Sequence, residues 1–276
     1  MTANNDSETP PDLLAHYTTL EGFVGIIASG TIWASNVSFL NDKRELTHAV
    51  KEAVQALRSI SSQDAHSQWG RALTAAAEKF EKGAIPTTYA SCFCRDDDLL
   101  NQWRGYGGSE QGVSILFKRS RLERRLKKDK AKLGRVYYTK RSTRQKVSEQ
   151  LEQQIEELRS WSDMFAPDDS ERDRRAYQAI SALLPRFKHL GFSSEREWRF
   201  VVQHDVDFDQ INYRTRNGVI VPYIKLGKAE SKLPIESVCI GPGKDPELTK
   251  KSVELFLKGH GYGNVRIVSS EVPYRT

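Results

Sequence analysis

Apolar residues recur along much of the chain at helical spacing. Leu20, Phe23 and Ile27 share one face of an expected helix, and Ser29 and Gly30 follow as its stop. The same criterion predicts further helices, which run from Asn41 or Asp42 to about Leu57, from Gln68 to Phe80 and from Pro246 to Gly259.

Runs rich in β-branched and aromatic residues predict strands between these helices. One strand should begin near Leu13, and the others cover residues 31–35, 88–93, 113–117, 198–202, 219–224, 235–240 and 265–268. The run over 113–117 is expected to pair with the run over 88–93. Helices gather in the first half and strands in the second, so we expect an α+β fold with a mixed, largely antiparallel sheet core and flanking helices.

The middle of the chain carries most of its charge. Arg and Lys dominate residues 119–135, and Glu and Gln dominate residues 145–160, with leucine and isoleucine at helical spacing. These residues predict a charged helical insert over about 119–185. It is either a polyanion-binding arm or, as the returning acidic residues favour, a solvated helix pair with complementary charges. Around it we expect a disordered lead-in over residues 1–11 and a single domain over 12–276.

Composition narrows the class of protein only modestly. Hydrophobic residues make up 38% of the chain and the formal net charge is +6, which favours weak attraction to polyanions. Cys92, Cys94 and Cys239 have no metal-ligand spacing, nor do the histidines, so we expect free thiols and no metal. The polar start and the lack of a long apolar run predict a cytoplasmic protein without a membrane anchor.

A pair of carboxylates stands at the start of one expected strand. Strand alternation would point Glu195 and Glu197 to the same side, with Arg199 on that side as well. Two such groups can stabilise a developing positive charge, and each raises the pKa of the other unless Arg199 compensates. The alternative is a surface strand with exposed ion pairs, against which the neighbouring Trp198 argues.

Aromatic residues and glycines alternate between the strands expected at 88–93 and 113–117. Trp103, Arg104 and Tyr106 are followed by Gly107 and Gly108, which predicts a loop that a ligand can approach closely. An aromatic ring there could stack on a flat heterocycle. Equally, these rings could fill the core.

A third motif ends the first expected strand. His16, Tyr17 and Thr18 come just before a helix that Thr18 or Thr19 could cap. A histidine at this point can form a hydrogen bond with a ribose hydroxyl or a ligand amide. The alternative is a core histidine whose hydrogen bonds are satisfied internally.

Taken together, a set of short motifs resembles the bacterial domain-of-unknown-function family 2971 (DUF2971). The motifs run nearly end to end, and the charged insert is the part that they cover least. They are His16-Tyr17-Thr18, Ile26-Ile27-Ala28-Ser29-Gly30, Phe39-Leu40-Asn41-Asp42, Ser91-Cys92-Phe93, Trp103-Arg104-Gly105-Tyr106-Gly107, Glu195-Arg196-Glu197-Trp198-Arg199, Ile240-Gly241-Pro242 and Pro273-Tyr274-Arg275.

A more distant resemblance is to ADP-ribosyltransferases. His16, Ser91, Tyr106 and Glu197 fall in the order of that family's strand histidine, middle-strand serine, tyrosine and catalytic glutamate, although its Ser-Thr-Ser triplet is only approximated. The resemblance implies NAD as cosubstrate and catalysis by Glu197 with Glu195. Binding contacts for NAD would come from a wider set: His16, Tyr17, Thr18, Ser91, Trp103, Arg104, Tyr106 and Arg199.

This resemblance implies a bacterial defence or toxin effector that modifies a nucleic acid or a protein. Two other functions stay open from the sequence. One is an effector that binds or cleaves DNA or RNA without NAD chemistry, using Arg104, Arg199 and the basic run. The other is a non-catalytic signalling or partner-binding module whose contact surface is the charged insert.

Overall fold

The structure is a computed structural model. It describes residues 9–40, 43–83, 87–106, 111–139, 143–165, 167–203, 208–216, 218–227 and 232–273. Several sequence features therefore lie outside the described residues: most of the expected disordered lead-in, the helix cap at Asn41 or Asp42, Gly107 and Gly108, and the Tyr274-Arg275 end of the last motif.

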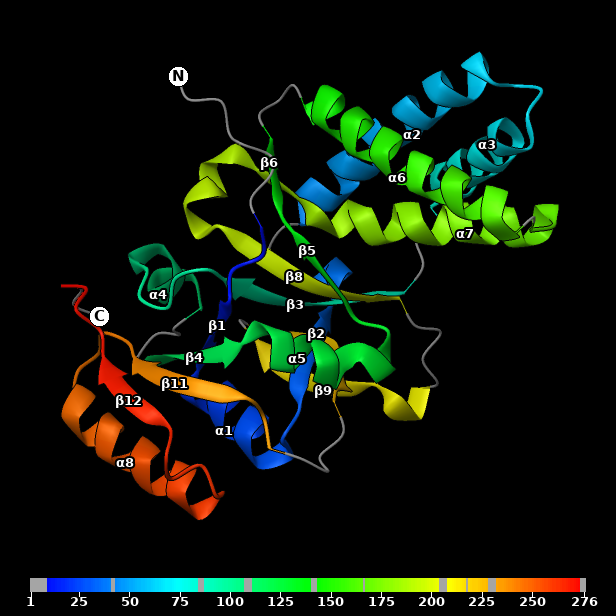
Figure 1. Ribbon diagram of the computed structural model, residues 1–276. Helices are drawn as coiled ribbons and strands as arrows, with labels where there is room; N and C mark the ends of the chain where they lie inside the picture. Colours follow the sequence, from blue (N-terminus) through cyan, green and yellow to red (C-terminus); the bar gives the residue numbers. More distant parts are fainter. Residues whose placement is uncertain are drawn as a thin grey trace.

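A ten-stranded sheet organises the molecule (Figure 1). Its main path runs β12-β11-β4-β1-β3-β2-β10-β9, and β8 and β5 extend it from the remaining side of β3. Neighbouring strands are antiparallel except for β11 and β12. The strands are β1 (Leu13–Thr19), β2 (Ile32–Asn36), β3 (Thr88–Cys94), β4 (Gly112–Lys118), β5 (Lys132–Arg135), β8 (Glu197–Gln203), β9 (Asn212–Arg216), β10 (Val219–Leu226), β11 (Ile235–Ile240) and β12 (Arg266–Ser269).

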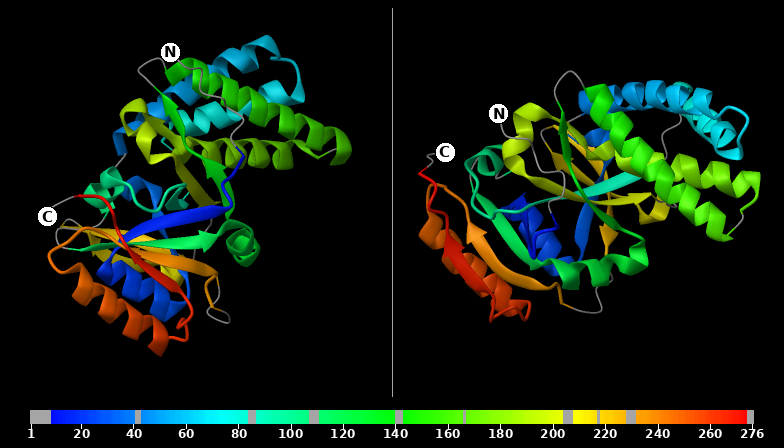
Figure 2. Two further views of the ribbon diagram at one scale, coloured as in Figure 1. Left: turned by 60° about the vertical axis from the view of Figure 1, so that its left-hand side comes forward. Right: turned by 45° about the horizontal axis from the view of Figure 1, so that its top comes forward.

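Helices form two groups around this sheet (Figure 2). The first group is α1 (Leu20–Ser29), α4 (Leu100–Tyr106), α5 (Arg119–Leu126) and α8 (Pro246–Gly259). The second group, here called the helical bundle, is α2 (Lys43–Gln63), α3 (Gln68–Glu81), α6 (Thr143–Phe165) and α7 (Asp169–Leu183). A small parallel pair, β6 (Tyr137–Thr139) and β7 (Phe187–His189), lies beside the bundle. In the described part of the chain, no helix combines the length and the apolar character that a membrane span needs.

The predicted α+β class with a mixed, largely antiparallel sheet is confirmed. Two details of the sequence prediction are wrong. Strands β3 and β4 do not pair, because β1 lies between them. The basic run over 119–135 is helical only as far as Asp129 and then enters the main sheet as β5. Leu122 and Leu126 hold α5, which precedes this strand, against the core.

The pairing of β1 with β3 is confined to Ala15 and Cys94. Beyond this pair β1 continues to Thr19, where it pairs with β4 alone, while the other end of β3 pairs with β2. The sheet is thus split along the line between β1 and β3. This split positions the candidate site.

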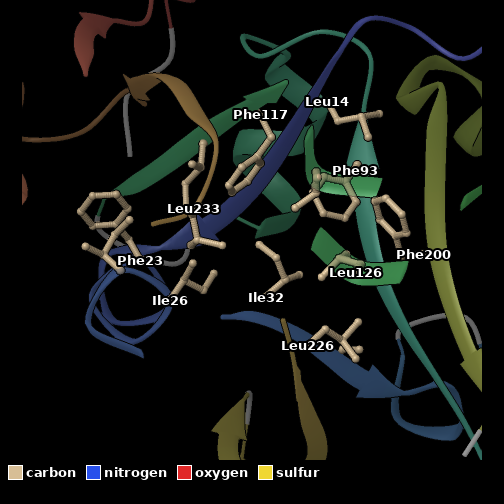
Figure 3. Packing of buried hydrophobic residues seen from close by; sticks show 14 of the residues in the cluster. Leu14, Phe23, Ile26, Ile32, Phe93, Phe117, Leu126, Phe200, Leu226 and Leu233 are labelled. Carbon is tan, nitrogen blue, oxygen red and sulfur yellow. The ribbon is translucent and has the colours of Figure 1, made fainter. Parts of the chain in front are cut away.

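The two largest hydrophobic cores among the described residues stabilise the sheet and the bundle. Phe93 packs edge to face against two other rings (Figure 3). The distance between ring centroids is 6.1 Å to Phe117 and 5.5 Å to Phe200. Residues of α1, α5 and α8 join the same core. The second core lies within the bundle and reaches β7 through Phe187.

Helix α8 offers a direct test of this packing. Leu257 is 1% exposed, whereas Leu255, two residues earlier, is 67% exposed. We expect Leu257→Ala to lower the free energy of unfolding by about 2–5 kcal/mol, because it leaves a cavity in the core. Leu255→Ala should change it by no more than about 0.5 kcal/mol. Urea denaturation followed by circular dichroism measures both, and equal losses would contradict the placement of α8.

Candidate functional site

A cavity of about 800 Å³ occupies the split between β1 and β3. Its walls come from both strands, the first turn of α1, helix α4 and the edge formed by β2, β9 and β10. Three arginines and two glutamates line it, so the lining carries a net positive charge. The charged residues are Glu21, Glu197, Arg199, Arg214 and Arg216.

Seven of the ten site residues named from the sequence line this cavity: His16, Tyr17, Thr18, Ser91, Tyr106, Glu197 and Arg199. The three that do not line it are Glu195, Trp103 and Arg104. Motifs far apart in the sequence therefore meet at one place.

His16 spans the split. Its ring nitrogen Nδ1 lies 2.8 Å from the carbonyl oxygen of Cys92 on β3. Since a carbonyl oxygen only accepts, Nδ1 carries the proton and Nε2 of the neutral ring is an acceptor. Burial, together with the positive charges of Arg214 and Arg216, lowers the pKa of His16 from 6.5 to about 4, despite the opposing effect of this hydrogen bond.

The first turn of α1 faces the cavity beside His16. Thr19 caps the helix by accepting a hydrogen bond from the Gly22 backbone nitrogen at 3.1 Å. A Cβ atom on Gly22 would lie 2.1 Å from Thr18 Oγ1, so only glycine allows this close approach. The end of α1 thus brings its partial positive charge to the cavity wall.

Glu197 lies at the start of β8 and is 2% exposed. Its carboxylate accepts hydrogen bonds from Arg199 Nε at 2.7 Å, Arg199 Nη2 at 3.0 Å and Lys188 Nζ at 3.2 Å. Burial alone would raise the pKa of Glu197, but the two cations and their hydrogen bonds outweigh it and lower the pKa to about 2. Arg199 therefore compensates for the buried charge, as the sequence analysis considered.

Glu195 is not part of the strand, contrary to expectation. It ends a 3₁₀ turn (Leu190–Glu195), and Arg196 then adopts a left-handed conformation with φ of 45°. The two carboxylates meet through Lys188 of β7, whose Nζ lies 2.7 Å from Glu195 Oε2. Lys188 was not anticipated, because it precedes the motif and belongs to a three-residue strand.

Helix α4 replaces the loop expected around Trp103. Trp103 is 3% exposed, and its ring packs edge-on against the ring of Tyr17 with 4.7 Å between centroids. Its Nε1–H donates to Asp98 Oδ1 over an N–O distance of 2.7 Å. It therefore fills the core, the alternative that the sequence left open, while Arg104 is exposed on the other side of the helix. Tyr106 alone brings an aromatic ring from this motif to the cavity.

Several cavity residues escaped the sequence analysis. Arg214 and Arg216 alternate along β9, a strand that was not predicted, and their spacing is the signal that could have identified them. The Arg216 guanidinium lies 5.2 Å from the centroid of the Tyr106 ring. Arg214 donates to Ser35 Oγ at 2.9 Å and lies 5.6 Å from the ring of Trp33.

Five buried polar atoms in the cavity lining have no hydrogen-bond partner among the described residues. They are Trp33 Nε1, Ser91 Oγ, Gln102 Nε2, Gln111 Oε1 and Arg214 Nε. Leaving such a group unpaired costs about 1–3 kcal/mol. A bound ligand can supply the missing partner of such a group in a cavity lining.

A metal ion has no ready set of ligands in the part of the chain that the structure describes: no three His, Cys, Asp or Glu side chains come together suitably. The three cysteines are free thiols. Burial raises the pKa of Cys92 and that of Cys94, so both favour the neutral form. The lining therefore offers contacts for an anionic ligand with flat rings, next to the buried, ionised carboxylate of Glu197.

The state of His16 can be read by nitrogen NMR. We expect its Nδ1 to be protonated and its Nε2 unprotonated at pH 7, with titration near pH 4, because burial and two arginines oppose the second proton. The variant His16→Gln identifies the resonances by their loss. Titration near the ordinary value of 6.5 would contradict the buried position of the ring.

Comparison with known proteins gives a family match but no closer relative. Residues 102–200 match the family described as Protein of unknown function (DUF2971). No curated protein and no solved structure matches the chain. The resemblance to ADP-ribosyltransferases is not shown by these comparisons and stays a prediction. The resemblance to DUF2971 is confirmed over residues 102–200, a segment that includes the charged insert and the cavity residues Tyr106, Glu197 and Arg199.

Proposed function

We propose that this protein binds NAD in the cavity and transfers its ADP-ribose part to a group on a nucleic acid or a protein. The observation that supports this most is that His16, Ser91, Tyr106 and Glu197, from four separate elements, line a single cavity. Its volume, about 800 Å³, is within the usual range for a cofactor-sized ligand.

The lining fits the parts of NAD. Arg214 and Arg216 offer positive charge to the two phosphates. Tyr106 offers a ring beside which the nicotinamide could stack. Ser91 Oγ and His16 Nε2 are suited to ribose hydroxyls, since one hydroxyl can both accept and donate.

In the proposed reaction, the bond between ribose C1′ and the nicotinamide nitrogen breaks. Its electron pair leaves with the nicotinamide, which becomes neutral, and positive charge develops on the ribose. An acceptor nucleophile then forms a bond to C1′ and loses a proton. Glu197 is suited to stabilise the developing charge because, with a pKa of about 2, it is ionised throughout the physiological pH range.

The ion pairs of Glu197 fix its position as well as its charge. Arg199 and Lys188 hold two sides of the carboxylate, and the Glu197 backbone nitrogen donates to Tyr138 Oη at 2.8 Å. A carboxylate held in this way needs no reorganisation when the positive charge appears. The positive charges of Arg199 and Lys188 also weaken the electric field of the Glu197 carboxylate. This carboxylate must therefore lie close to the ribose to stabilise its positive charge.

Replacement of Glu197 tests the proposed function. We expect Glu197→Gln to reduce release of labelled nicotinamide from NAD at least about a hundredfold, because the amide lacks the negative charge. NAD binding should persist, since the arginines and aromatic rings stay in place. The measurement is nicotinamide release in the presence of separate protein, RNA and DNA pools.

Glu195→Gln is the matched control, because Glu195 also pairs with Lys188 but does not line the cavity. It should retain turnover within about a factor of ten. Thermal melting of both variants separates a loss of chemistry from a loss of folding, which the loss of one of the two ion pairs of Lys188 could cause. Equal turnover in Glu197→Gln and the unmodified protein would remove Glu197 from the mechanism.

A further inference from the structure

We propose that Gln102 determines specificity for the nicotinamide group, by donating a hydrogen bond from Nε2 to the carbonyl oxygen of its carboxamide. This inference rests on the proposed function, because it assumes that NAD occupies the cavity. It adds a residue that neither the sequence motifs nor the family resemblances assign to the site.

The amide nitrogen of Gln102 lowers the stability of the folded protein when no ligand is bound, because it is buried without a hydrogen-bond partner in the described part of the chain. Its side chain lines the cavity and the residue is 3% exposed, yet Nε2 has no partner among the described residues. A buried amide normally forms hydrogen bonds within the protein. The amide nitrogen of Gln111, also in the cavity lining, does so by donating to the Gly241 carbonyl oxygen at 2.6 Å.

The position of Gln102 on α4 indicates which part of the ligand it meets. Tyr106 lies four residues later and therefore on the same face of the helix, with Cβ atoms about 5–6 Å apart. A flat ring stacked beside Tyr106 would present its edge to a side chain one turn away. The carboxamide of nicotinamide projects from such an edge, in reach of Gln102.

This part of the cavity is also the part nearest the proposed chemistry. Asn101 Nδ2 donates to Ser194 Oγ at 2.8 Å, which fastens α4 to the turn that leads into Glu197. Tyr106 and Glu197 both line the cavity, so the phenol and the carboxylate face the same space. The ring that leaves from C1′ must lie beside Glu197, hence beside Tyr106 and Gln102.

The chemistry of the amide favours a neutral carbonyl as its partner. Nε2 is a donor only, so the ligand must supply an acceptor. Arg214, which lies beside Ser35 and the Trp33 ring, provides a stronger, charge-assisted site for phosphate oxygens. The carboxamide oxygen of the nicotinamide, which carries no formal charge of its own, is the acceptor that remains for Gln102.

The test compares three nucleotides by isothermal titration calorimetry: NAD, its thionicotinamide analogue and ADP-ribose. The analogue replaces the carbonyl oxygen with sulfur, a weak acceptor, and ADP-ribose lacks the ring entirely. We expect the unmodified protein to bind NAD about tenfold more tightly than the analogue. Gln102→Met should remove this preference and leave the affinity for ADP-ribose unchanged.

Gln203→Met is the control, because Gln203 Nε2 is likewise unpartnered among the described residues but lies outside the cavity lining. It should keep the tenfold preference. If Gln102→Met retains the preference, or loses ADP-ribose as strongly as NAD, the assignment of Gln102 is overturned. If the unmodified protein binds none of the three nucleotides, the proposed function itself fails.

Discussion

β1 and β3 form a single residue pair. Next to this pair, the backbone groups along the edge of β3 that faces β1 have no strand to pair with among the described residues. The hydrogen bond from His16 Nδ1 to the Cys92 carbonyl oxygen satisfies one of these groups with a side chain. A side chain spans more distance than a strand pairing allows, so the split can remain open as a cavity. The tautomer of His16, the place of the α1 N-terminus and the convergence of the motifs all depend on this separation.

A second constraint ties the cavity to the helical bundle. Arg199 donates to the Pro185 carbonyl oxygen, and Lys188, the residue after Phe187, donates to Glu197. Buried charges of this kind are stable only when each has a partner, so the bundle and β8 are linked through their ion pairs. The charged insert contributes Tyr138 and the Pro185 carbonyl oxygen to this arrangement, whereas Lys188 and Arg199 follow it in the chain.

Local patterns predicted much of this fold, and non-local pairing limited the rest. Apolar spacing located α1 and its glycine stop, but it could not show that β1 would separate β3 from β4. Trp103 resembled a ligand platform because its burial depends on contacts that the motif does not show, with Tyr17 of β1 and with Asp98. Arg214, Lys188 and Gln102 were missed because short strands and a lone polar residue leave weak sequence signals.

The central claim is that the split between β1 and β3 is where NAD binds. Hydrogen–deuterium exchange with and without NAD tests it on the whole chain. We expect NAD to slow exchange in the peptides that cover residues 15–22, 89–94 and 212–216, which surround the cavity. Unchanged exchange in all three, or protection confined to α6 and α7, would contradict the account.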